Sequence, residues 1–140
     1  MKSLTITLCG SARFEEHWKV WNKVLSLSGH TVFSLACMPS DNGGKDWYTP
    51  EQKRRLDAVH KLKIQRSDAI AVLNVDGYVG ESTLSEIEHA RLLDKRIYAL
   101  QSWGAHKPWC SVGMPSFWDL LPEAGQYRNS LVDLVRTTDA

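Results

Sequence analysis

Stretches with the apolar pattern of strands alternate along this chain with stretches that have the pattern of amphipathic helices. The four strand-like stretches lie at 3–9, 30–36, 68–75 and 96–100. The third is apolar almost throughout, which is typical of a strand covered on both faces in a parallel sheet. Because a helix-length connection follows each of the first three strands, the order predicts an α/β fold. We expect a three-layer doubly wound (Rossmann-like) sheet, mostly parallel, with about five strands.

The connections carry the periodicity and the end signals of three helices. The first is marked by an apolar stripe at the spacing of one helix face: Phe14, Trp18, Trp21 and Leu25. Gly29 ends this helix in the position after the C-cap, and the third helix is expected at about 83–94. Thr49, Pro50 and Gln52 open the second helix as N-cap, first helical residue and capping-box partner. Its predicted inner face consists of Leu56, Val59, His60 and Ile64.

The last third of the chain has weaker patterns. The stretch 101–115 is rich in Trp, Gly and Pro and predicts a long irregular loop. A short fifth strand is expected at 117–121 and a closing helix at 123–137. The chain has the length of one ordinary domain and shows no repeat or linker, so we expect residues 1–140 to form a single domain.

Composition and charge exclude several classes of protein. Hydrophobic residues make up 43% and charged residues 24%, as in an average soluble globular protein. The 17 Lys and Arg nearly balance the 16 Asp and Glu, so no strong field attracts nucleic acid or an anionic membrane. No apolar run has the length of a membrane span, and no secretion signal is apparent. The three cysteines are widely spaced and unpaired in pattern, which favours a reducing, cytoplasmic location.

The turn after the first strand is one candidate ligand site. In open α/β sheets, ligands bind in the crevice outside the carboxyl ends of the strands. The residues of this turn are Gly10, Ser11, Ala12 and Arg13. Free backbone N–H groups, the Ser11 hydroxyl and the Arg13 guanidinium together suit an anion. The alternative is a plain turn in which Ser11 is only an N-cap, and the sequence does not decide between the two.

The loop after the third strand is a second candidate, at 76–86. Its glycines allow close approach of backbone to a ligand, and its hydroxyls and helix start offer donors: Gly77, Gly80, Ser82 and Thr83. Glu86 falls on the same helix face as Ala90 and Leu93, where its carboxylate can face the crevice as nucleophile or base. The alternative is a capping box formed by Thr83 and Glu86, which the spacing alone favours.

Other chemical residues carry less signal. His60 lies on an apolar helix face, and we interpret it first as a core histidine and second as a catalytic one. No group of His, Cys or carboxylate residues has metal-ligand spacing, so the sequence predicts no metal, and no cofactor is expected. Trp103 and Trp109 fit either stacking on a base or packing in a loop or subunit contact.

Taken together, three motifs resemble the nucleoside 2-deoxyribosyltransferase-like superfamily, including its 2′-deoxynucleoside 5′-phosphate N-hydrolase branch. They lie at 6–13, 67–72 and 85–90, and the resemblance covers roughly 4–100. It implies that Glu86 is a nucleophile that attacks the anomeric carbon of a ribosyl or deoxyribosyl group, expels the base and forms a glycosyl ester. The ester is then hydrolysed by water or transferred to a second base.

The resemblance also implies roles for the surrounding residues and partners. The 10–13 turn is expected to hold the sugar and 5′-phosphate of a nucleoside or nucleotide, with Asp76 or His60 assisting. A homo-oligomer, dimer or tetramer, is implied because neighbouring subunits complete such active sites. The chain departs from the family at Gly80, where hydrolases carry Ser and transferases Asp, and at His60, where an acidic residue is usual. The alternative hypothesis is therefore a module that senses a nucleotide without turning it over.

Overall fold

Four parallel strands form the centre of the molecule. The computed structural model describes residues 2–43, 48–101 and 116–121. The strands are β1 (Thr5–Cys9), β2 (Thr31–Phe33), β3 (Ala69–Val72) and β4 (Arg96–Ala99). Their order across the sheet is β2-β1-β3-β4, and all three pairings are parallel. The predicted parallel α/β sheet is thus confirmed, with four strands in the described part of the chain in place of about five.

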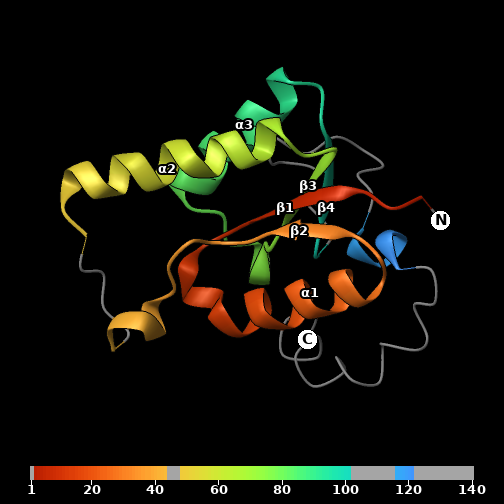
Figure 1. The fold of residues 1–140 in the computed structure, drawn as a ribbon, viewed down its shortest axis with the longest axis horizontal. Helices are drawn as coiled ribbons and strands as arrows, with labels where there is room; N and C mark the ends of the chain where they lie inside the picture. Colours follow the sequence, from red (N-terminus) through yellow and green to blue (C-terminus); the bar gives the residue numbers. More distant parts are fainter. Residues whose placement is uncertain (1, 44–47, 102–115, 122–140) are drawn as a thin grey trace.

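Helices cover both faces of this sheet and give three layers (Figure 1). Helix α1 (Glu15–Leu27) lies on one face, whereas α2 (Pro50–Gln65) and α3 (Glu81–Leu92) lie side by side on the other. Gly29 follows the C-cap of α1 with a φ of +97°, as its position in the sequence predicts. None of the helices within 2–43, 48–101 and 116–121 has the length and apolar character needed to cross a bilayer.

Each face of the sheet has its own core. On the α1 face, Trp18 and Trp21 are fully buried, and the Trp21 ring meets the Phe117 ring edge-on with centroids 4.9 Å apart. On the other face, Ile64 of α2 and Ile87 of α3 pack onto the sheet. Burying a side chain of this size stabilises the fold by about 1.5–3 kcal/mol. The apolar stripe predicted for the first helix is therefore the core face of α1.

The predicted fifth strand is wrong. Phe117–Leu120 forms a 3₁₀ helix, η4, and only Ser116 pairs with the sheet, as a single bridge to Ala99. The Ser116 hydroxyl accepts a hydrogen bond from the Trp118 N–H, and the Asp119 carboxylate accepts one from the Ser116 N–H. These local bonds close a turn and compete with a strand ladder.

Two helix predictions need correction. Helix α3 begins at Glu81, two residues before the predicted start at 83. Val59, predicted on the inner face of the second helix, is 44% exposed, whereas His60 and Ile64 are buried. Most of the predicted loop at 101–115 and all of the closing helix at 123–137 fall outside the described residues.

The sheet order creates a switch point between β1 and β3. From β1 the chain crosses to β2 on one side, and from β3 it crosses to β4 on the other. The carboxyl ends of β1 and β3 therefore open a crevice, the usual ligand position in such sheets. Gly10 allows the segments that follow β1 and β3 to approach each other there. A Cβ at this residue would lie 2.9 Å from the Cβ of Leu73.

Candidate active site

A cavity of about 470 Å³ opens at the carboxyl ends of the strands, within the usual volume range of small-molecule sites. It is lined by the turn after β1, the segment after β2, residues along α2 and the start of α3. Its lining residues include Gly10, Ser11, Ala12, Leu35, Ala36, Cys37, Lys53, Asp57, His60, Lys63, Gly80, Ser82, Thr83 and Glu86. The two loops singled out in the sequence thus line the same cavity.

The early start of α3 directs Glu86 into this cavity. Gly80 is the N-cap and its backbone oxygen accepts a hydrogen bond from the Leu84 N–H at 2.9 Å. Thr83 is therefore a buried residue inside the first turn and not an N-cap, so the capping box of Thr83 with Glu86, favoured by spacing, does not form. The Glu86 side chain is 12% exposed and lines the cavity.

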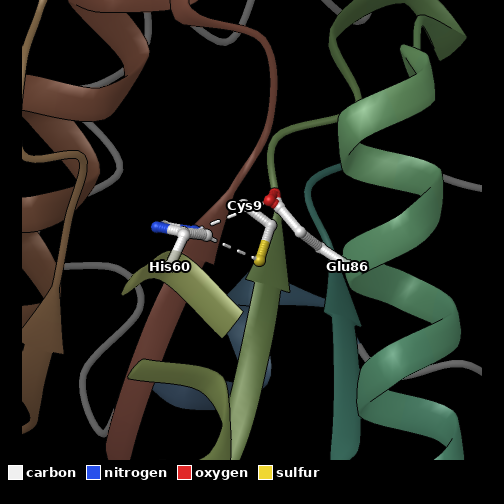
Figure 2. A group of neighbouring side chains, drawn as sticks. All are labelled: Cys9, His60 and Glu86. Atoms are coloured by element: carbon white, nitrogen blue, oxygen red, sulfur yellow. Dashed lines mark hydrogen bonds and ion pairs between the residues drawn. The ribbon is translucent and has the colours of Figure 1, made fainter. Parts of the chain in front are cut away.

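Three reactive side chains meet beside the cavity (Figure 2): His60 and Glu86 line it, and Cys9 lies fully buried behind them. Cys9 comes from the end of β1, His60 from α2 and Glu86 from α3. The His60 Nε2 atom lies 3.8 Å from Cys9 Sγ and 3.9 Å from Glu86 Oε2. It also donates a hydrogen bond to the Leu8 carbonyl at 2.9 Å, which assigns the ring proton to Nε2.

Burial decides the charge state of these groups. Desolvation, reinforced by the nearby Asp57 carboxylate, raises the pKa of Glu86 from 4.5 to about 8. Desolvation also lowers the pKa of His60 from 6.5 to about 4 and raises that of Cys9 well above 9.0. At neutral pH both Glu86 and His60 are therefore mainly uncharged. Their contact at 3.9 Å has the distance of an ion pair but not its charges.

Not every candidate residue lines the cavity. Arg13 stacks its guanidinium over the Tyr78 ring, 4.1 Å from the centroid, and Tyr78 itself lines the cavity. Asp76 and Gly77 lie in a short 3₁₀ turn, η3 (Val75–Gly77), where both are exposed and outside the cavity lining. Both residues have a positive φ, which lets the backbone turn between β3 and α3.

Sequence reasoning named His60 of α2 as a candidate but missed Lys53 and Asp57 of the same helix, and it missed Cys9. Lys53, Asp57 and His60 follow one another at i, i+4 and i+7, so they share the helix face that overhangs the cavity. That polar stripe is the signal that marks α2 as part of the site. Cys9 carries no such local signal, because its closeness to His60 arises only when α2 packs on the end of β1.

Comparison with known proteins gives a likeness of fold. No protein-family model matches the sequence, and no curated protein matches it. Among solved structures, the chain is similar to a 2-deoxyribosyltransferase from the psychrotolerant bacterium Bacillus psychrosaccharolyticus, with a TM-score of 0.56. The two share 20% sequence identity over 84% of this chain and 96% of that chain. At this identity the likeness establishes the shared α/β fold.

Proposed function

We propose that this chain cleaves or exchanges the N-glycosidic bond of a nucleoside or nucleoside 5′-monophosphate, with Glu86 as nucleophile. One observation carries the proposal: Glu86 lines the cavity at the β1/β3 switch point together with Ser11 of the other candidate loop. A carboxylate at the ligand position of a doubly wound sheet can attack a sugar carbon. The name of the similar solved structure, a 2-deoxyribosyltransferase, agrees with this chemistry.

The cavity has separate surfaces for the parts of such a substrate. Ser11 and the start of α3 at Ser82 and Thr83 offer hydroxyl and backbone N–H donors for sugar and phosphate oxygens. Leu35 in the segment after β2 and Leu56 of α2 supply apolar surface where a flat base can pack. A 5′-phosphate would be recognised by the first of these surfaces, the polar one formed by Ser11, Ser82 and Thr83.

The reaction then proceeds in two displacements. An ionised Glu86 oxygen forms a bond to the anomeric carbon while the bond between this carbon and the base nitrogen breaks. The electron pair of the broken bond leaves with the base, which takes up a proton. Water or a second base next attacks the glycosyl ester and releases the Glu86 carboxylate. His60 is a positioning residue in this scheme, because its neutral ring contacts Glu86 and helps to keep it out of water.

Substitution of Glu86 by Gln tests the proposal, with Glu88→Gln as the matched control on the exposed face of the same helix. Each protein is incubated with a panel of nucleosides and 5′-monophosphates, and free base is measured by chromatography. We expect release by the native chain and the control, and a loss of at least about a thousandfold in Glu86→Gln. Equal rates in Glu86→Gln and the native chain would remove Glu86 from the mechanism.

A non-catalytic nucleotide sensor is the second candidate. It is favoured by the raised pKa of Glu86, which keeps the nucleophile mainly protonated at neutral pH, and by Gly80, where the resembling enzymes carry Ser or Asp. The same panel separates the two functions. Tight binding of a nucleotide with no free base under any condition supports the sensor.

Two further proposals follow from the family resemblance. We expect a cytoplasmic homo-oligomer, dimer or tetramer, in which a neighbouring subunit completes the cavity. Sedimentation equilibrium of the full chain tests the assembly, and a monomer at micromolar concentration contradicts it.

A further inference from the structure

Three side chains that commonly ligate metals in proteins converge beside the cavity: His60 and Glu86, which line it, and the fully buried Cys9. Figure 2 shows them reaching toward one another from β1, α2 and α3. Their Sγ, imidazole and carboxylate ligand atoms all lie within 4.8 Å of one another. We propose that this cluster binds a thiophilic divalent cation of the zinc class, in a form of the protein distinct from the one that would use the free Glu86 carboxylate as nucleophile.

The separations are close to those of ligands around a single ion. Zinc lies about 2.3 Å from a thiolate and about 2.0 Å from imidazole or carboxylate, so in a tetrahedral site the sulfur and nitrogen atoms lie about 3.5 Å apart and the nitrogen and oxygen atoms about 3.3 Å apart. His60 Nε2 is 3.8 Å from Cys9 Sγ and 3.9 Å from Glu86 Oε2, so small side-chain rotations bring the three atoms onto one ion. A soft thiolate beside an imidazole favours zinc over magnesium or calcium.

The contacts of His60 fit a metal ligand better than a member of a proton relay. In a catalytic triad of nucleophile, histidine and acid, the nucleophile and the acid contact opposite nitrogens of the histidine ring. Here Cys9 and Glu86 both approach Nε2. The other nitrogen, Nδ1, is buried and has no hydrogen-bond partner among the described residues. Both groups thus approach the same ring nitrogen, as they would if all three side chains bound one ion.

The charges and protons of the binding step balance. Cys9 and Glu86 each release a proton to solvent, and the resulting two negative charges match the two positive charges of the ion. The His60 proton moves from Nε2 to the unpartnered Nδ1, and the imidazole turns away from the Leu8 carbonyl oxygen, which lies 2.9 Å from Nε2, so that the ion can take its place on this nitrogen. Because His60 and Glu86 line the cavity, a water molecule from the cavity can supply the fourth ligand that a tetrahedral zinc site needs.

Cobalt binding provides a direct test without any nucleoside. The reduced, chelator-treated full chain is titrated with Co²⁺, whose bond to a thiolate absorbs in the near ultraviolet. We expect this absorption to saturate at a single equivalent and to disappear when Zn²⁺ is added. Cys9→Ser should abolish it, whereas Cys37→Ser, which changes a free cysteine that lines the cavity, should keep it. Glu86→Gln should weaken binding at least about tenfold.

Several results would overturn the cation site. These are absence of the absorption, its persistence in Cys9→Ser, or its loss in Cys37→Ser. Circular dichroism checks the fold of each variant, and if Cys9→Ser does not fold, unchanged cobalt affinity in Glu86→Gln overturns the site by itself. A chain that binds cobalt as expected but releases no base contradicts only the proposed function. A chain that releases base but binds no cobalt contradicts only the cation site.

Discussion

The His60 imidazole and the Glu86 carboxyl face each other across the base of the cavity, with Nε2 and Oε2 3.9 Å apart. They come from the two helices that cover one face of the sheet, α2 and α3. Burial keeps both groups neutral at pH 7, because it raises the pKa of Glu86 to about 8 and lowers that of His60 to about 4. A buried acid that must ionise to react makes pH the natural variable for testing this site.

Stability should depend on pH through Glu86. Below pH 4.5 both folded and unfolded states hold the proton, between 4.5 and about 8 only the folded state holds it, and above that neither does. The free energy of unfolding should therefore fall as the pH rises through this window. The size of the pKa shift of Glu86 corresponds to a loss on the order of a few kcal/mol. Urea unfolding of the native chain and Glu86→Gln should agree near pH 4 and favour Glu86→Gln near pH 9. Glu88→Gln, an exposed control, should follow the native chain.

Turnover should rise with pH in the same window. Only ionised Glu86 attacks the sugar, so kcat/KM is expected to increase about tenfold per pH unit and to level near the pKa of about 8. Initial rates of base release between about pH 5 and 9 measure this profile. A rate that falls as pH rises toward 8 would assign Glu86 the role of a proton donor and contradict the nucleophile.

Gly10→Ala should disturb the crevice. The added Cβ would lie 2.9 Å from the Cβ of Leu73 and 3.3 Å from its backbone oxygen, so β1 and β3 must separate locally. We expect a loss of about 1–3 kcal/mol in unfolding free energy and weaker nucleotide binding. Gly43→Ala is the control, because that glycine has a φ of +62° but nothing within 4 Å of the new Cβ. Equal losses in both variants would show that the contact with Leu73 has no effect.

His30 should tie the 116–121 segment to the sheet. Its Nδ1 accepts a hydrogen bond from the Leu4 N–H at 3.1 Å, and its Nε2 donates one to the Leu120 carbonyl at 2.6 Å. His30→Ala leaves both backbone groups without this partner, so we expect a loss of about 2–4 kcal/mol in unfolding free energy. Thermal unfolding measures it, and an unchanged midpoint contradicts this role.

The sequence predicts the fold well where periodicity is strong. The stripe that includes Trp18 and Trp21 identifies the core face of α1, and the apolar run of β3 identifies a central strand. The prediction of a strand fails at 117–121, where the hydrogen bonds of Ser116 and Asp119 outweigh strand propensity.

The site is predicted only in part, because two of its features depend on packing. Glu86 would form a capping box if α3 began at 83, but it enters the cavity because α3 begins at Glu81. The spacing of Thr83 and Glu86 alone does not reveal this earlier start. The closeness of Cys9 to His60 joins residues 51 positions apart. Such a contact follows from how α2 lies on the sheet, and no local pattern encodes it.

A covalent intermediate on Glu86 is the most direct test of the central claim. The native chain is mixed with a substrate from which it releases base, quenched in acid within the first turnover and digested for mass spectrometry. We predict a sugar adduct on the peptide that contains Glu86, present in Glu88→Gln and absent in Glu86→Gln. Release of base with no adduct on that peptide, or with the adduct on another residue, contradicts the account.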